Sequence, residues 1–275
     1  MLRSQQGIAL VLTLMAVSFM VAVTVHLFST INWQMQASVN LRDSVALDAA
    51  NRSGLSLARA ALEADRQENQ ADSLHDSWNR IDAEKLRSLL GQQELAVTVT
   101  DLSGLLQVNG LVSSDTAPDA RSRQQLYRQV WERFLASGRF GEIERSKARE
   151  LINAITDWID QDDDLVTDPG GAESGFYLSR SPSYEPRNGP LQYPEELLLI
   201  KGMTPELFYG NEEHSGIGDF ITVAGDDGRV NINTAPLEVL LALADNMDEE
   251  MAQDLIETRE EENNRDMLNN PGWYR

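Results

Sequence analysis

The acidic stretch DWIDQDDDLVTDPGGAESGFY, at residues 157–177, holds the side chains best suited to metal chemistry. Aspartates alternate along it, and further carboxylates lie close by. Hard oxygen ligands at one-three-five spacing can turn inward on a tight loop and surround Ca²⁺, which takes about 6–8 oxygens. The candidate calcium ligands are Asp160, Asp162, Asp163, Asp164, Asp168 and Glu173.

A solvated acidic loop is the open alternative, because crowded carboxylates repel one another unless solvent spreads them or a cation neutralises them. The loop is not an EF-hand: counted from Asp160, the sixth residue is Leu165 in place of glycine, and the twelfth is Gly171 in place of glutamate. Glycosidases also use paired carboxylates. These charges are clustered, however, and nothing in the sequence fixes two of them across a substrate cleft.

The composition narrows the possible functions further. The 275 residues carry a formal net charge of −21 and no cysteine. The charge argues against nucleic-acid binding as the main task, and the missing cysteine excludes disulfides, thiolate metal sites and cysteine nucleophiles. Only His26, His75 and His214 could serve a triad, and no nucleophile elbow or P-loop is present. We therefore expect a protein that is not an enzyme.

The N-terminal segment Ile8–Phe28 is free of charged residues and long enough to span a bilayer. At about 1.5 Å per residue, its helix would cover a hydrocarbon core of about 30 Å. A removable signal sequence has a shorter apolar core, of about 7–15 residues, and a small-residue cleavage site. The segment is therefore expected to stay as an anchor, with His26 at the interface and not a ligand.

The leader MLRSQQG resembles that of a type IV prepilin-like protein, because Gly7 stands at the border between the polar and the apolar residues. Cleavage after Gly7 would make Ile8 the first residue of the mature chain. Most pilin-like proteins carry glutamate at the fifth mature position, where this chain has Leu12. A plain N-terminal anchor remains open at this point.

The elements that must position these residues follow from periodicity. A continuous helix is expected from about 8 to 66, with a possible break near Asn32. Apolar and small residues at steps of three and four give it a narrow face for close packing; they are Leu47, Ala50, Gly54, Leu57 and Ala61. Downstream we expect a strand over 94–101, a strand or turn in 102–112, helices over 122–135, 143–159 and 194–210, a hairpin over 219–236 and a helical pair over 237–262.

Three stretches together with the prepilin-like start resemble one family. They are DWIDQDDDLVTDPGGAE, NGPLQYPEELLLIKGMTPELF and GRVNINTAPLEVLLAL, and the combination is similar to the minor pseudopilin K of type II secretion systems. The resemblance runs from Ile8 to about Arg259. Leu12 fits it, because this family typically lacks the glutamate, and an intramembrane carboxylate without a partner costs about 2.5–3.5 kcal/mol.

The resemblance implies an α+β, pilin-like fold with a long N-terminal transmembrane helix, a small antiparallel sheet and an inserted all-helical domain. The expected parts are a leader at 1–7, a span at 8–28, a pilin-like domain from 67–112 and 216–275, and an insertion at 113–215. Two features depart from the family's pattern. The sequence stops at MLNNPGWYR, where members of the family usually continue into a further strand, and its C-terminal helices are unusually acidic between Asp248 and Glu262.

The resemblance also implies a role and partners. A prepilin peptidase would process the chain at Gly7 and Ile8, and it would lie at the tip of the pseudopilus. Its partners would be the I and J minor pseudopilins, the major pseudopilin and the inner membrane, with a periplasmic head. Calcium would bind the loop 160–173, with Asp160, Asp162 and Glu173 carried over from the family and the other candidate ligands added from spacing.

Other function classes stay open. A type IV pilus tip protein would share most of these features, and a membrane-anchored hydrolase would use the acidic loop as its active site. The stretch VNINTAPLEVLLAL also looks like a helix-hairpin-helix DNA-binding unit. Its hairpin, ADNMDEEMAQD, has no glycine and would repel phosphate, so Asn231 and Asn233 are expected to make turn hydrogen bonds and Pro236 to start a helix.

Overall fold

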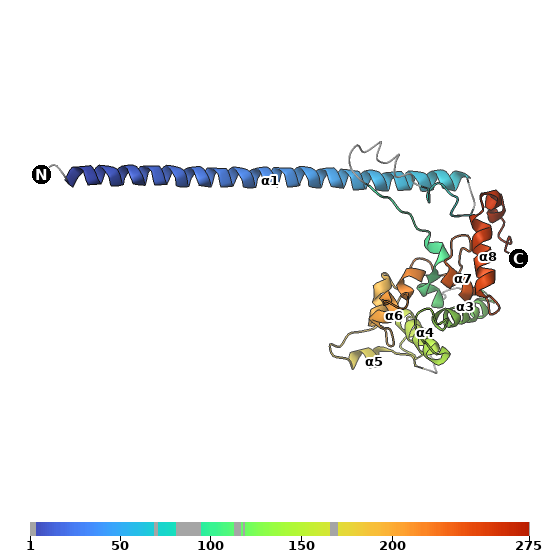
Figure 1. The fold of residues 1–275 in the computed structure, drawn as a ribbon. Helices are drawn as coiled ribbons and strands as arrows, with labels where there is room; N and C mark the ends of the chain where they lie inside the picture. Colours follow the sequence, from blue (N-terminus) through green and yellow to red (C-terminus); the bar gives the residue numbers. More distant parts are fainter. Residues whose placement is uncertain are drawn as a thin grey trace. The chain divides into compact units, whose positions relative to one another are not determined.

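The computed structural model describes residues 4–68, 71–80, 95–112, 117, 119–165 and 170–274 (Figure 1). The chain forms two compact units, one from residues 1–63 and 81–98 and the other from 64–80 and 99–275. In chain order the elements are α1 (Ser4–Glu68), η1 (Leu102–Gly104), β1 (Leu106–Gln107), η2 (Val108–Leu111), α3 (Ala120–Leu135), α4 (Arg145–Ile159), α5 (Ser174–Leu178), η3 (Pro194–Leu199), α6 (Pro205–Tyr209), η4 (Ile217–Phe220), β2 (Ile221–Thr222), α7 (Leu237–Leu243), α8 (Glu249–Glu260) and η5 (Glu262–Asn269), where η marks a 3₁₀ helix.

Helix α1 is continuous over 65 residues, so the long N-terminal helix is confirmed and the possible break near Asn32 is wrong. No proline interrupts the segment, and the i→i−4 ladder has no other cause to stop there. Within its first half, the hydroxyls of Thr13, Thr24 and Thr30 donate to carbonyls one turn back, at 2.8–2.9 Å. Among the described residues, α1 is the one helix long and apolar enough to cross a membrane.

The small residues of the predicted α1 face pack closely in the first unit, but Leu47, which was placed on the same face, is 59% exposed. Ala50, Gly54 and Ala58 are buried. A Cβ atom at Gly54 would lie 2.9 Å from Leu95 Cδ2 and 3.0 Å from Val97 Cγ2. The predicted strand over 94–101 is corrected here: its described residues are not paired as a strand, and Leu95 and Val97 use their side chains to pack on the helix instead.

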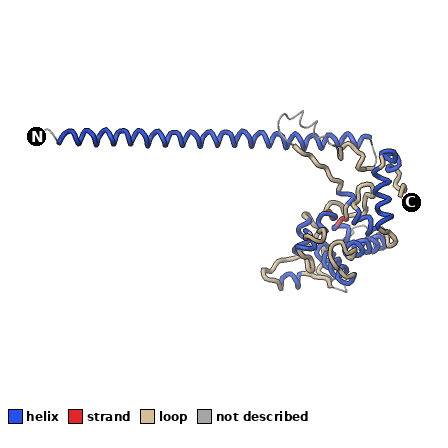
Figure 2. Tube along the Cα trace, in the orientation of Figure 1, coloured by secondary structure: helices blue, strands red, loops and turns tan. Residues whose placement is uncertain are grey.

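The core of the second unit is helical (Figure 2). Helix α3 packs against α4 and α7, and α7 packs against α8. These helices match the predicted spans 122–135, 143–159 and 237–262 within a few residues. The predicted helix over 194–210 instead splits into η3 and α6, because the chain turns at Gly202, which has a φ of +89°. The largest fully buried side chains include Trp131, Phe134, Leu135, Ile152, Ile155, Tyr177, Leu197, Ile217 and Leu240.

The sheet described by the structure has two short strands, β1 and β2, and they run parallel. Leu106 pairs with Ile221, and Gln107 pairs with Thr222. The expected antiparallel orientation is therefore wrong. The two strands are separated by the whole helical block, and a long crossover of this kind is what a parallel pair requires.

The predicted hairpin over 219–236 does not form among these residues. The turn at Asp226–Gly228 is bound instead by the side chain of Gln107: its Nε2 donates to Asp227 Oδ1 at 3.1 Å, and its Oε1 accepts from Gly228 N at 3.1 Å. Asp227 Oδ1 also accepts from Arg229 N at 3.0 Å. These side-chain bonds satisfy the turn locally, in competition with a strand ladder.

The stretch after this turn makes the expected turn hydrogen bonds. Asn231 Oδ1 accepts from Asn233 N at 3.1 Å, and Pro236 stands directly before α7 as its N-cap. Both asparagines also donate to the carbonyl of Asp72, at 3.0 and 3.2 Å. Trp273 Nε1 donates to Asn233 Oδ1 at 2.7 Å, so the C-terminal residues are tied to the same stretch.

Candidate metal centre

Helix α4 carries the first acidic side chains of the site on its last turn. Every residue of the helix from Leu151 to Ile159 is buried, so its last two turns are covered on all sides, and Asp157 has no exposed surface. Arg128 of α3 supports the same turn from the neighbouring helix. It donates to Thr156 Oγ1 at 2.6 Å and to Asn153 Oδ1. Asp160 follows the helix as its C-cap.

The chain returns to this turn at Glu173, the residue directly before α5. Gly170 has a φ of +92°, and a Cβ there would lie 2.6 Å from Glu150 Cγ, so the return requires glycine. Lys201 holds the returning backbone, because its Nζ donates to the carbonyls of Gly170 and Gly171, each at 3.1 Å. Ala172 N then donates to Asp157 Oδ2 at 2.7 Å.

Three carboxylates meet where the two segments come together. Asp157, Asp160 and Glu173 each place one oxygen within 4.8 Å of the others. Glu173 is 5% exposed, and neither of its carboxylate oxygens has a hydrogen-bond partner; buried Asp160 Oδ1 also lacks one. A buried, unpartnered carboxylate is costly, so this arrangement requires a proton or a cation.

The electrostatics point the same way. Burial, followed by the charges of Asp162 and Asp157, raises the pKa of Asp160 to about 7. Burial, followed by Asp157, Asp160 and other nearby aspartates, raises the pKa of Glu173 to about 8. Both shifts arise because like charges crowd together away from solvent. A divalent cation among these oxygens would offset the like-charge repulsion that contributes to both raised pKa values.

The predicted ligands divide into groups. Asp160 and Glu173 are brought together. Asp162 stays exposed, with its Oδ1 accepting from Asp164 N at 2.9 Å. Asp163 Oδ1 accepts from Ser174 N at 3.1 Å, and hydrogen bonds from Ser174 lower the pKa of Asp163.

Asp164 and Asp168 are the last two of the six predicted calcium ligands. Asp164 is exposed and is not part of the trio. Asp168 lies outside the described residues. Asp157 was not among the predicted ligands, because it lies opposite the apolar stripe of its helix, where periodicity predicts exposure. Its burial follows from the covering of the whole end of α4, which the sequence pattern does not show.

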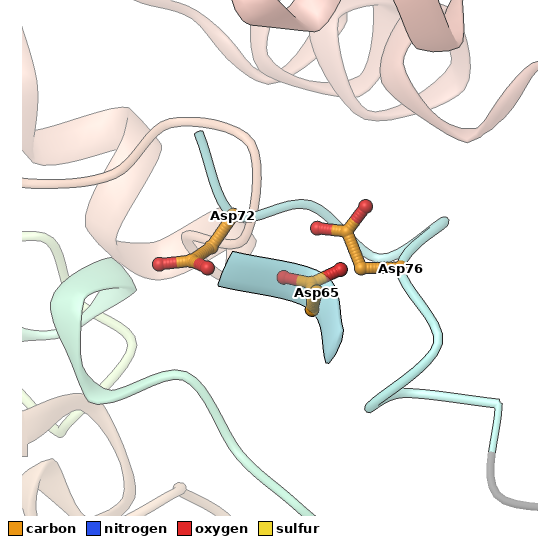
Figure 3. Close-up of side chains that lie close together, drawn as sticks. All are labelled: Asp65, Asp72 and Asp76. Carbon is orange, nitrogen blue, oxygen red and sulfur yellow. The ribbon is translucent and has the colours of Figure 1, made fainter. Parts of the chain in front are cut away.

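A second acidic group lies in the same unit, at the end of α1 and in the turns that follow (Figure 3). Asp65, Asp72 and Asp76 also place one oxygen each within 4.8 Å of the others. Here the protein supplies partners: Ser73 N donates to Asp76 Oδ2 at 2.6 Å, and Arg265 lies 3.8 Å from Asp76 Oδ1. Burial and then the charges of Asp101 and Asp76 raise the pKa of Asp72. The sequence analysis did not anticipate this group.

Comparison with known proteins identifies the family. The family described as "Type II secretion system (T2SS), protein K" matches residues 104–210 and 230–274. A type II secretion system protein K of Pseudomonas aeruginosa is 26% identical over 267 residues, covering 94% of this chain and 74% of the relative. One of Klebsiella pneumoniae is 25% identical over 236 residues, covering 84% of this chain and 66% of the relative.

A solved structure shares the fold. A chain in the crystal structure of the GspK-GspI-GspJ complex from enterotoxigenic Escherichia coli matches with a TM-score of 0.60 at 20% identity. The match covers 79% of this chain and 72% of that chain. It confirms the predicted fold class, with the parallel orientation of the sheet as the one correction. The chain therefore belongs to the type II secretion system protein K family.

Proposed function

We propose that this chain is a minor pseudopilin at the tip of the type II secretion pseudopilus, where it initiates or caps assembly during protein export across the outer membrane. The observation that carries the proposal is one chain that joins a 65-residue, N-terminally apolar helix to a head matched by the protein K family. An anchoring helix joined to such a head suits a structural subunit. Among the described residues, we identify no arrangement of side chains typical of a catalytic site. The matched family is named for the type II secretion system, which favours this role over that of a type IV pilus tip protein.

The apolar helix serves as a single-pass inner-membrane anchor and as the assembly stalk, with the head in the periplasm. Prepilin peptidase cleaves after Gly7, so the mature chain begins at Ile8 and keeps the whole span. A Cβ at Gly7 would meet nothing within 4 Å. The need for glycine there therefore comes from the peptidase and not from this chain's own packing.

The partners in this proposal are the I and J minor pseudopilins and the major pseudopilin. The solved relative was crystallised as a GspK-GspI-GspJ complex, which supports the first two. Outside the buried small-residue face, α1 exposes large apolar side chains beyond the membrane-length segment, including Leu47 and Leu55 at 59% and 54%. Exposed apolar residues along a helix of this kind mark a surface for packing against other helices.

Calcium is the cofactor that the head's acidic trio fits best. Asp157, Asp160 and Glu173 would hold it, with Asp162 and Asp163 within reach of the same loop. The unpartnered oxygens of Glu173 and Asp160 support this assignment, because they are hard donors without a protein partner. When bound, the ion would offset two of the three negative charges of the trio and would join the end of α4 to the chain before α5.

The proposed role is tested by export in a cell from which the chromosomal gene has been deleted. We expect secretion of the host's type II substrates to stop and to return when the full chain is supplied. Gly7→Val should block processing and secretion together, as read by mass spectrometry of the N-terminus and by assay of the culture medium. Gly175→Val is the matched control, because a Cβ there also meets nothing within 4 Å. Normal export without the chain would refute the proposal.

Subunit contacts are tested by cross-linking, which the absence of cysteine makes clean. Leu47→Cys or Leu55→Cys should form a disulfide with single-cysteine I or J subunits at matched depths. Arg52→Cys, on an exposed side chain that forms an ion pair with Asp48, is the comparison position. Equal cross-linking at all three positions would show random collision and would contradict a specific helical interface.

A further inference from the structure

A second concave site lies in the head, beside the acidic loop but separate from its carboxylates. It is a cavity of about 650 Å³ between the turn after α3, the first half of α4 and the α6 region. Its apolar lining includes Phe140 and Leu151, which are each 5% exposed, and the partly buried Ile143 and Leu207. The volume is in the range of sites that hold a few side chains or a small ligand.

The rim of this cavity is acidic. Four glutamates line it: Glu142, Glu144, Glu150 and Glu206. Two lysines also line it, but both are engaged. Lys147 Nζ lies 2.8 Å from Glu150 Oε2, and Lys201 Nζ donates to backbone carbonyls and lies 5.1 Å from the Phe176 ring centre.

Two of the rim carboxylates remain available. Glu142 and Glu206 are exposed, and no partner is assigned to either carboxylate among the described parts of the chain. Glu144 accepts only a 3.3 Å contact from the neighbouring Ser146 hydroxyl. The cavity therefore combines an apolar interior with uncompensated negative charge at its mouth, and its complement is a long aliphatic side chain that ends in a cation.

We propose that this cavity docks a segment of a partner polypeptide that presents a lysine or arginine beside aliphatic side chains. The methylene stem and the aliphatic neighbours cover Leu151 and Leu207, and the cationic end reaches Glu142 and Glu206. The proposal for this cavity does not rest on the role proposed for α1. It gives the head a way to recognise a protein by local sequence.

The probe is a fluorescent, end-blocked peptide with the sequence Gly-Leu-Lys-Leu-Gly, and the protein is the full chain in lipid nanodiscs. Fluorescence anisotropy measures binding up to about 1 mM, the range expected of a contact this small. The Gly-Leu-Glu-Leu-Gly peptide tests charge, and the norleucine peptide tests the aliphatic contribution alone. We expect the lysine peptide to bind most tightly and to weaken as salt screens the rim.

The variants locate the site. Glu142→Gln with Glu206→Gln should weaken the lysine peptide by about fivefold or more, as expected for the loss of one or two exposed ion pairs. Glu212→Gln with Glu213→Gln removes the same charge from exposed residues outside the cavity lining and should leave affinity unchanged. Absence of lysine-peptide binding, equal binding of the glutamate peptide, or equal weakening by both double variants would each overturn the proposal. Unaltered melting of the variants excludes misfolding.

Discussion

The two acidic groups of the head carry the same chemistry and resolve it in different ways. Asp65, Asp72 and Asp76 lie among donors, with the backbone of Ser73 and the guanidinium of Arg265 facing Asp76. At the other group, the carboxylate oxygens of Glu173 have no partner at all. The comparison shows that a cluster of carboxylates does not by itself indicate a cation site. The stronger indication is a cluster with buried carboxylate oxygens that no hydrogen-bond donor satisfies.

The donors differ because the backbones differ. Asp76 lies in a tight turn that aims an N–H group back at its own carboxylate. Glu173 occupies the N-cap position of α5 but makes no capping bond, so its side chain is free to turn toward Asp157 and Asp160. Because the Glu173 carboxylate makes no capping hydrogen bond, it remains available to bind a cation together with Asp157 and Asp160.

Calcium gives the largest expected difference between the two groups. At a concentration one hundred times the Kd, binding to the native state adds about 2.7 kcal/mol, or about 5–10 °C in Tm for a domain of this size. Asp160→Asn with Glu173→Gln should abolish that increase, whereas Asp76→Asn should retain it on a lower baseline. Calorimetry of the full chain in detergent, with calcium or with chelator, measures both. If the calcium-dependent rise in Tm were lost in Asp76→Asn and kept in the double variant, the ion would bind at Asp65, Asp72 and Asp76 instead.

Neutralising one carboxylate in each group, with chelator present, should give effects of opposite sign. Asp76→Asn removes a charged acceptor from a buried hydrogen bond and should cost about 1–3 kcal/mol. Above pH 8, where Glu173 is ionised despite its raised pKa, Glu173→Gln removes like-charge repulsion and should stabilise the metal-free chain by about 1 kcal/mol. Chemical denaturation reports both changes. Equal destabilisation by the two variants would show that Glu173 is satisfied in the native protein.

The pH dependence should separate the groups next. The pKa values of Asp160 and Glu173 are raised from 3.8 and 4.5 to about 7 and about 8 in the folded chain. The native state therefore binds more protons than the unfolded state from about pH 4 to 8, and the metal-free unfolding free energy falls as pH rises through that window.

Melting in chelator at pH 5.5 and 8.5 measures this fall, which we expect to be a few degrees because partial exposure of Asp160 screens its charge. Calcium, or Asp160→Asn with Glu173→Gln, should flatten the profile. The same slope in the double variant would assign the effect to Asp72, whose pKa is also raised.

The last prediction concerns Lys201, which holds the backbone that returns to the trio. Lys201→Met should weaken calcium binding about tenfold, because the loss of a group that orients ligands typically costs this much. Lys147→Met is the matched control, since Lys147 is largely exposed and pairs with Glu150. Calcium titration by calorimetry compares the two, and identical affinities would show that Lys201 does not position the loop.

Periodicity predicted the helices well because it reports which face of a local segment is buried. Helices α1, α4, α7 and α8 lie close to their expected spans. Periodicity says nothing about which distant segment covers that face. It therefore could not show that β1 and β2 pair in parallel, or that Gln107 would occupy the turn expected to make a hairpin.

The sequence predicted only part of the site, because spacing reports local neighbours and not distant ones. Spacing along the loop placed Asp160 and Glu173 among six candidates, but Asp157 belongs to the helix before it. The trio also depends on the turn at Gly170 and on Lys201. Of these two, Lys201 lies more than thirty residues after Asp157 in the sequence. Sequence distance of that kind carries no geometric signal, and the group at Asp65 was missed on the same account.

The threonines of α1 bear on what happens when the helix leaves a bilayer. Thr13, Thr24 and Thr30 bond to carbonyls of their own helix, so their hydroxyls need no neighbour to satisfy them in lipid. If the proposed anchor is drawn out of a bilayer, these three hydroxyls keep their bonds within the helix and add no bond to a neighbouring protein that must break first.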